Sequence, residues 1–293
     1  VDEVLNSYSE PFADSSAIAF SLLSKKVSKE RSVVLSGDGA DELFGGYRKH
    51  KAEYLFRKYP RLNSAFSSIL SLSLKNDGGR DSAIANTKRQ LKKWLNASSL
   101  NNEERYLFWA SIVDRNETGT LLKNDTYQAH GVDKKLATLN DVLLQDFKQV
   151  LPGDMLYKVD RSSMQYGLEV RVPFLDHELV DFVFSLPSEW KLKGGERKYL
   201  LKQAFKNQIP AAIRNRRKKG FEVPLNAWLQ GPLKSKVDKL LNKEQIMDMA
   251  LFDFDEVQRI VQRSRSTNPG NSAQVLWSML VFQQWTINYK PTY

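Results

Sequence analysis

The stretch 32-SVVLSGDGADELFGGYRKH-50 indicates the fold, because a short apolar run ends in a turn crowded with glycines and carboxylates. The run 32–35 is rich in β-branched residues and too short for a helix, so it predicts a buried strand. Ahead of it, residues 14–30 have apolar side chains at helical spacing, with Asp14 or the following serines as caps. A helix followed by a buried strand is half of a βαβ unit. The sequence therefore predicts an α/β portion whose earlier half lies outside this chain.

The glycine-rich turn that follows the strand predicts a ligand site. Open α/β sheets bind ligands at the carboxyl ends of their strands, and free backbone N–H groups in such a turn form a cradle for anions. The carboxylates of Asp38 and Asp41 cannot bind phosphate directly, so they predict a bridging Mg²⁺ ion. The turn lacks the spacing of a Walker A loop, of G-x-G-x-x-G and of an EF-hand. An equally open alternative is a plain turn in which Asp38 or Asp41 caps the next helix.

Beyond residue 47 the pattern is mainly helical. Apolar residues recur at helical spacing over 62–70, 107–112 and 275–285. We find no internal repeat. The expected architecture is a small α/β remnant followed by a largely helical body.

The composition excludes several kinds of site. None of the 293 residues is cysteine, which excludes disulfides, thiolate catalysis and thiolate metal sites within the chain and favours a reducing, cytoplasmic location. The three histidines have no paired spacing, so a histidine-rich metal site is not expected. The net charge of +10 suits either phosphate contacts with a nucleic acid or an enzyme that handles a polyphosphate. Charge by itself does not choose between these two classes.

Three later blocks add a resemblance to a known family. They are 154-DMLYKVDRSSMQYGLEVRVPFLDHELVDFVFSLP-187, 194-GGERKYLLKQAF-205 and 216-RRKKGFEVPLNAWL-229. Together with 36-SGDGADELFGGY-47 they resemble the synthetase domain of glutamine-dependent asparagine synthetases. Four blocks in the right order make a specific match, and the resemblance covers nearly the whole chain.

The resemblance implies a fold and a reaction. The fold is α/β, the remnant of a parallel-sheet ATP-pyrophosphatase domain (adenine nucleotide alpha hydrolase-like) with a predominantly α-helical body. The family activates the side-chain carboxylate of aspartate with ATP, releases pyrophosphate, and lets ammonia displace AMP. The implied cofactors are ATP and Mg²⁺, and the partners are small molecules: aspartate or a similar acid, and ammonia from glutamine in the full-length enzyme. A nucleic acid or membrane partner is not expected, and a homodimer through the full-length enzyme is compatible with the family.

The same resemblance divides the chain into parts. The whole of 1–293 is expected to be the C-terminal part of one synthetase domain. We expect an α/β portion with the acidic glycine loop over 1–50, a helical region over 51–150, the active-site blocks over 151–230 and C-terminal helices over 231–293.

The resemblance assigns site residues by their positions in the matching motifs. Ser36 and Gly37 are expected to contact the nucleotide through their backbone, and Asp41 to hold Mg²⁺ on the pyrophosphate. Asp38 stands where many family members carry Glu; it is expected to be catalytic and a second candidate for Mg²⁺. Lys198 matches the lysine that stabilises the transition state for pyrophosphate release, a task that suits a mobile point charge.

A second set belongs to the motif R-x-x-M-x-x-x-x-E-x-R-x-P-F-L-D. Arg161, Glu169 and Arg171 are expected to contact substrate or orient the site, with Glu169 and Arg171 as a candidate buried pair. The stretch 173–175 is expected to pack, and the basic run 214–219 to be a solvated loop.

Two parts of the family are absent from these 293 residues: the glutaminase domain and the Ser-Gly-Gly-x-Asp-Ser loop of the first strand. We therefore expect a truncated synthetase that is inactive by itself and exposes apolar surface where further strands would pack. Three other interpretations stay open. They are a paralogous amidotransferase acting on another carboxylate, such as a sugar acid or a β-lactam precursor, a basic nucleic-acid-binding module, and a non-catalytic scaffold.

Overall fold

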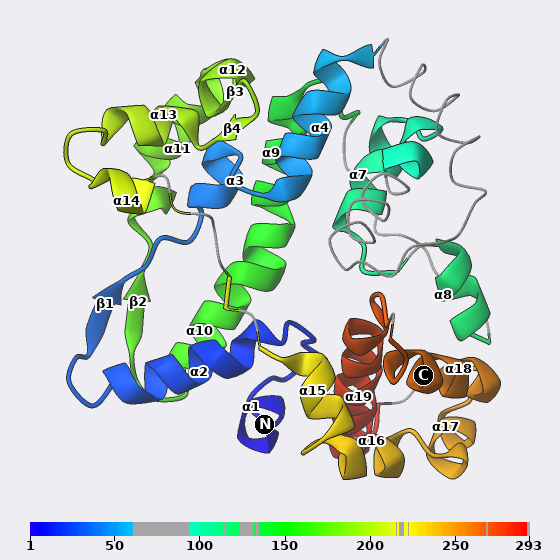
Figure 1. Ribbon diagram of the computed structural model, residues 1–293. Helices are drawn as coiled ribbons and strands as arrows, with labels where there is room; N and C mark the ends of the chain where they lie inside the picture. The colour runs from blue at the N-terminus through cyan, green and yellow to red at the C-terminus, as the bar shows by residue number, and fades with distance from the viewer. Residues whose placement is uncertain are drawn as a thin grey trace.

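The computed structural model describes residues 1–60, 94–113, 115–123, 132, 135–214, 216, 220–221, 223–267 and 269–291. Two small sheets are embedded in a helical protein (Figure 1). The helices of the first half and centre are α1 (Asp2–Leu5), α2 (Ser16–Val27), α3 (Ala40–Phe44), α4 (Arg48–Lys58), α7 (Asn102–Ala110), α8 (Arg115–Leu121), α9 (Leu139–Lys148), the π-helical turn η1 (Leu151–Leu156), α10 (Tyr157–Met164), the 3₁₀ turn η2 (Pro173–Leu175), α11 (His177–Ser185) and α12 (Ser188–Lys191). The remaining helices are α13 (Tyr199–Ala204), α14 (Ala211–Arg214), α15 (Leu225–Gln230), α16 (Lys234–Leu240), α17 (Lys243–Met249), α18 (Phe254–Ser264) and α19 (Ser272–Tyr289). The strands are β1 (Val33–Leu35), β2 (Glu169–Arg171), β3 (Leu192–Lys193) and β4 (Glu196–Arg197).

The first sheet joins two distant parts of the chain. Strand β1 runs parallel to β2, with Val33 opposite Glu169 and Leu35 opposite Arg171. Helices α2 and α10 pack against each other, and α10 also packs against β2 (Figure 1). The predicted strand is therefore confirmed, but β2 was not predicted.

The prediction that this strand is buried is wrong. Leu35 is 72% exposed and Val33 is 40% exposed. Parallel sheets are normally covered on both faces. In the described part of the chain, helices cover one face of the β1–β2 pair, so the side chains of Val33 and Leu35 face outward.

Helix α2 forms where the apolar spacing predicts it, although it is shorter than the predicted range 14–30. Ser15, one of the expected caps, is the N-cap residue but makes no side-chain capping bond, and the carboxylate of Asp14 instead accepts a hydrogen bond from the N–H of Ser16 at 2.9 Å. The lysines Lys25 and Lys26 occupy the last turn, where the helix dipole favours cations.

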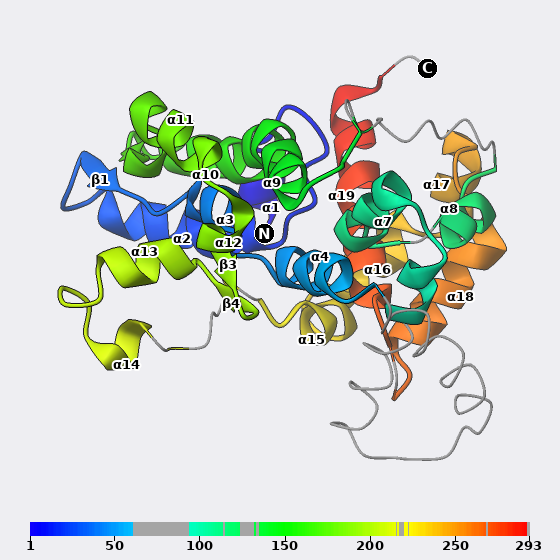
Figure 2. The same cartoon turned by 90° about the horizontal axis from the view of Figure 1, so that it is seen from above.

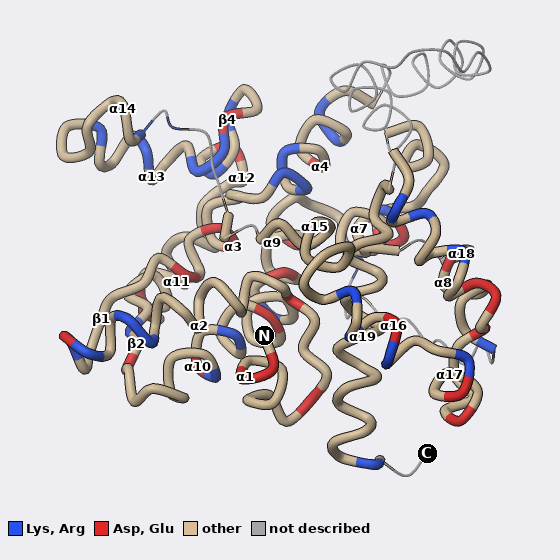
Figure 3. Tube along the Cα trace, turned by 60° about the horizontal axis from the view of Figure 1, so that its bottom comes forward, with Lys and Arg blue, Asp and Glu red and all other residues tan. Residues whose placement is uncertain are grey.

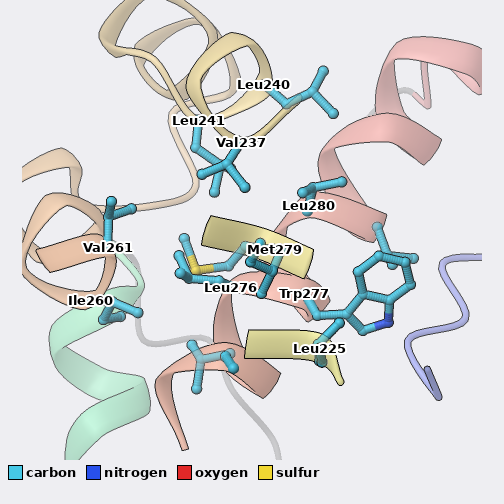
Figure 4. Close-up of a cluster of buried hydrophobic side chains, with 14 of the residues drawn as sticks. Leu225, Val237, Leu240, Leu241, Ile260, Val261, Leu276, Trp277, Met279 and Leu280 are labelled. Atoms are coloured by element: carbon cyan, nitrogen blue, oxygen red, sulfur yellow. The ribbon is translucent and has the colours of Figure 1, made fainter. Parts of the chain in front are cut away.

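The C-terminal helices α15 to α19 lie together in Figure 2 and contribute most of the largest apolar cluster among the described residues, to which α1 adds Val4 and α2 adds Ile18. Side chains from α15, α16, α18 and α19 converge in it, among them Leu225, Val237, Ile260, Leu276 and Leu280 (Figure 4). Helix α19 confirms the helical spacing predicted over 275–285. This cluster is the main apolar core of the helical body.

Other predictions had mixed outcomes. The predicted helical stripe over 62–70 lies outside the described residues. The stripe over 107–112 is wrong at its end, because α7 stops at Ala110 and Ile112 is exposed. The hairpin β3–β4, an antiparallel pair, was not predicted. Throughout the described residues, no helix has both the length and the apolar character that crossing a membrane would require.

Candidate active site

The loop after β1 is folded by its own side chains. The N–H of Ser36 donates to the carbonyl of Arg171 at 2.8 Å, which prolongs the β1–β2 pairing by one residue. The hydroxyl of Ser36 donates to the carboxylate of Asp38, and the N–H of Asp38 donates back to that hydroxyl at 3.1 Å. Helix α3 then begins at Ala40 with Gly39 as its cap and without a side-chain capping bond. The alternative in which Asp38 or Asp41 caps the helix is therefore wrong.

Gly37 leaves the loop open to its surroundings. A Cβ atom at this position would have no atom within 4 Å of it. Packing within the described chain thus does not require a glycine here. Close approach of a ligand to the backbone would require one.

Asp41 and Lys198 meet beside this loop. The Nζ atom of Lys198 lies 3.0 Å from Oδ1 of Asp41, and both side chains are about one quarter exposed. Lys198 is the residue before α13, as predicted, and its backbone is left-handed with a φ of 56°. Its N–H donates to the carbonyl of Phe44, at the end of α3, at 3.1 Å. A non-glycine residue in this conformation is strained, and such strain is concentrated at functional sites.

Glu169 and Arg171 form a pair, but the pair is not buried. The Nε atom of Arg171 donates to Oε1 of Glu169 at 2.7 Å, and the two side chains are more than half exposed. Because both project from the short strand β2 on its open face, the expectation of a buried pair is wrong. What links β2 to the loop is backbone bonding, through the Arg171 carbonyl.

Arg161 lies in a different place. It stands on α10 with its guanidinium 5.5 Å from the centre of the Tyr157 ring. It lines an open pocket of about 580 Å³ between α1 and α10, together with Glu3 and Asp160. No described hydrogen bond or ion pair joins Arg161 to the Asp41–Lys198 pair.

The expected packing of 173–175 is confirmed at Phe174, whereas Arg214 of the basic run ends helix α14 and is not in a loop. Phe174 in η2 packs against Phe44 of α3, with ring centres 6.1 Å apart. Asp176 caps α11 by accepting from the N–H of Leu179 at 3.1 Å. In the basic run, Arg214 donates to the carbonyl of Lys206 at 2.6 Å, while 215 and 217–219 lie outside the described residues.

Sequence reasoning missed a carboxylate pair near the site. Lys158 contacts Asp14 at 2.7 Å, and Asp154 lies beside them in η1. Burial, reinforced by the charge of Asp14 and opposed by that of Lys158, raises the pKa of Asp154 to about 6. Asp154 and Lys158 are one helical turn apart inside a matching block, so their spacing was a usable signal. No signal in the sequence indicated that Asp14 would lie beside these two residues.

Sequence reasoning also missed a hydrogen-bonded set behind α3. It consists of Glu42, Tyr47, His50 and Asp146, all buried or partly buried. Nothing in the spacing of these residues marks them, because Asp146 joins the set from the distant helix α9.

The residues present fit a cation only as part of a larger site. Within the described ranges, no group of three or more His, Asp or Glu side chains could hold a metal ion. Mg²⁺ is usually bound by one or two carboxylates together with substrate phosphates. The half-buried carboxylate of Asp41, paired with Lys198, suits an ion that is shared with bound phosphates.

Comparison with known proteins identifies similar sequences. The family model described as asparagine synthase matches residues 1–287. The chain is 30% identical to asparagine synthetase [glutamine-hydrolyzing] 1 of Bacillus subtilis, over 98% of this chain and 45% of that protein. It is also 30% identical to a putative asparagine synthetase of Mycobacterium tuberculosis, over 94% and 42% of the two chains. It is 27% identical to amidase chyE of Penicillium rubens, over 79% and 38%. The chain thus spans less than half the length of these relatives.

Proposed function

Because the chain belongs to the asparagine synthase family, we propose that it is part of an ATP-dependent, amide-forming ligase. In this reaction the side-chain carboxylate of aspartate attacks ATP, pyrophosphate leaves, and ammonia derived from glutamine displaces AMP to form asparagine. We propose that this chain supplies the pyrophosphate-binding part of the site. Its four regions, 1–50, 51–150, 151–230 and 231–293, then belong to one synthetase domain.

The observation that carries the proposal is the Asp41–Lys198 pair at the end of β1. An ammonium and a carboxylate 3.0 Å apart, both partly open to solvent, present a positive donor and an oxygen ligand side by side. Pyrophosphate leaving an acyl-adenylate carries several negative charges, and neutralising them lowers the barrier.

Each loop residue has a place in this scheme. The open space at Gly37, beside Ser36 whose N–H is bonded to Arg171, receives the nucleotide, and Lys198 swings from Asp41 to a phosphate oxygen, as its flexible stem permits. Mg²⁺ shared by Asp41 and the phosphates would supply additional positive charge when bound. Asp38, held by Ser36, faces the same turn and is our candidate for handling a proton during amide formation.

The remaining predicted residues have weaker support. Glu169 and Arg171 orient the loop through the backbone of β2, and their exposed side chains are free to meet substrate. Arg161 keeps only a predicted role, since its pocket lies between α1 and α10. A cytoplasmic location and a homodimer likewise stay predictions.

The test is pyrophosphate release from ATP by the natural polypeptide that carries this chain, with Mg²⁺, aspartate and ammonia. Changing Asp41→Ala should lower the rate by about a hundred- to a thousand-fold, the usual effect of losing one preorganised electrostatic group. The control is Asp248→Ala, which removes an exposed carboxylate from α17 and should leave the rate unchanged.

Each outcome is informative. Aspartate-dependent release that the variant loses supports the proposal. Release with a different carboxylic acid would keep the mechanism and replace the substrate by, for example, a sugar acid or a β-lactam precursor. The similarity to an amidase, besides asparagine synthetases, makes this second substrate class worth including. No release with any acid would contradict a ligase and favour a non-catalytic scaffold.

A nucleic-acid-binding module has less support. The described Lys and Arg residues are spread over many elements (Figure 3). On the basic helix α4, Lys49 and Arg57 are engaged by Asp146 and Glu53. Strong, salt-dependent DNA binding would be needed to favour this class.

A further inference from the structure

A buried hydrogen bond lies directly behind the Asp41 helix. Glu42, the residue after Asp41 in α3, is 1% exposed. The hydroxyl of Tyr47 donates to its Oε1 atom at 2.5 Å. The bond therefore spans the Gly45–Gly46 turn and ties the start of α4 back onto α3 (Figure 1).

The same tyrosine is anchored on its other side. Its N–H donates to Nδ1 of His50 at 3.4 Å, and Nε2 of His50 donates to Asp146 at 2.6 Å. His50 and Asp146 are fully buried, and burial lowers the pKa of His50, so the ring is neutral with its proton on Nε2. Asp146 also accepts from Lys49 and from the hydroxyl of Tyr106, both at 2.7 Å. Three donors from α4 and α7 thus hold one carboxylate of α9.

The Gly45–Gly46 turn, which Tyr47 closes, lies directly against the side chains of Asp41 and Lys198. A Cβ atom on Gly46 would lie 1.7 Å from Oδ1 of Asp41 and 2.4 Å from Cε of Lys198. The carbonyl of Gly46 accepts from Arg197 at 2.8 Å, one residue before Lys198. A shift of this turn by a few tenths of an ångström would therefore move both members of the pair.

We propose that Tyr47 is a positioning residue for the Asp41–Lys198 pair. Its hydroxyl on Glu42 and its N–H on His50 hold the Gly45–Gly46 turn against the two side chains. This inference rests on the proposed function, because it assigns the pair its role in pyrophosphate release. The hydrogen bonds that Tyr47 makes with Glu42 and His50 lie on either side of the turn, so they act on the pair through the turn.

The key variant is Tyr47→Phe, which removes the hydroxyl and keeps the ring. The matched control is Tyr54→Phe on the same helix, whose hydroxyl accepts from Lys58 at 3.0 Å and lies outside the set. In the pyrophosphate-release assay with the natural polypeptide, we expect kcat to fall about ten- to a hundred-fold for Tyr47→Phe, as for other groups that orient ligating side chains. The KM for the carboxylic acid should stay within twofold, and Tyr54→Phe should match the wild type.

A second readout does not depend on turnover. Mn²⁺ binding in the presence of pyrophosphate, followed by electron paramagnetic resonance, should weaken about tenfold or more for Tyr47→Phe and stay unchanged for Tyr54→Phe. A purely structural loss would instead lower thermal stability and leave both the affinity and kcat per folded molecule intact. That result would overturn the proposal.

A second pair of variants covers the case in which Tyr47→Phe does not fold. Glu42→Gln keeps an oxygen that can accept from Tyr47, whereas Glu42→Leu does not. We expect the glutamine to keep kcat and Mn²⁺ affinity within about threefold of the wild type, and the leucine to lose both. Equal behaviour of the two would overturn the proposal. If the wild type itself releases no pyrophosphate, the proposed function fails, and the Mn²⁺ measurement still tests the positioning role.

Discussion

Two regions of this molecule differ in whether their interiors contain charged groups. The C-terminal helices α15 to α19 surround an apolar cluster in which Leu276 and Leu280 are almost fully buried. The region of α3, α4 and α9 has charged groups in its interior beside its apolar clusters. There Asp146 meets Lys49 and His50, and Glu53 accepts from Arg57 and Arg105.

The difference shows that the interactions that stabilise the fold are not the same as those that position reactive groups. Apolar burial stabilises a fold in proportion to the area removed from water, and it is non-directional. A buried charge is tolerated only when every partner is in place, so it holds its surroundings in one geometry. The region that borders Asp41 and Lys198 is the one with buried charges, which suits a site in which small displacements matter. Three measurements on the unfolding of this chain test this comparison, from the largest expected effect to the smallest.

The largest loss of unfolding free energy is expected from Asp146→Ala. Burial opposes ionisation of Asp146, but the hydrogen bond from His50 and the charge of Lys49 outweigh it and lower the pKa of this carboxyl. Removing it leaves Lys49 and two neutral donors without their acceptor, at a cost of about 4 kcal/mol. Urea denaturation measures the effect, with Asp181→Ala on the exposed face of α11 as control. Equal, small losses for both variants would mean that the charged interior is not what holds this region together.

A somewhat smaller loss, about 3 kcal/mol, is expected from Leu280→Ala in the apolar cluster, because a cavity forms where the side chain was fully buried. No titratable group is involved, so the loss should be the same at pH 5 and pH 8. Ile287→Ala, on the exposed part of the same helix α19, should cost less than 1 kcal/mol. If the stability loss of Leu280→Ala depended strongly on pH, the apolar cluster would not differ from the charged region as described.

The smallest change in unfolding free energy is expected from Asp154→Asn, and it is a gain of stability. The folded-state pKa of about 6 lies above the ordinary value of 3.8, so the folded protein binds this proton more tightly than the unfolded chain. Wild-type stability contributed by this group is therefore present below pH 4 and is lost as the pH rises to 6. The asparagine variant, which cannot ionise, should be more stable than the wild type by about 2 kcal/mol at pH 7 and by little at pH 3. A stability difference that does not change with pH would show that Asp154 ionises freely.

Local patterns predicted the elements that depend on local contacts. The apolar spacing predicted α2 and α19, and the β-branched run predicted β1, since each of these reports on neighbouring residues in one segment. The motif positions brought Ser36, Asp41 and Lys198 into consideration, and the structure pairs Lys198 with Asp41 while it bonds Ser36 to Arg171 of β2. The exposure of Leu35 was not predicted, because burial depends on what lies above the strand.

The sequence by itself determined that an acidic glycine loop follows a short strand, that cysteine chemistry is absent, and that helices make up most of the part of the chain that the structure describes. Only the tertiary structure decided that β2 lies beside β1, that Lys198 reaches Asp41, and that Tyr47 and Asp146 tie α4 behind the loop. The physical reason is that periodicity and capping depend on residues a few positions apart. A salt bridge or a buried hydrogen bond between distant segments depends on the path of the whole chain, and no local pattern records it.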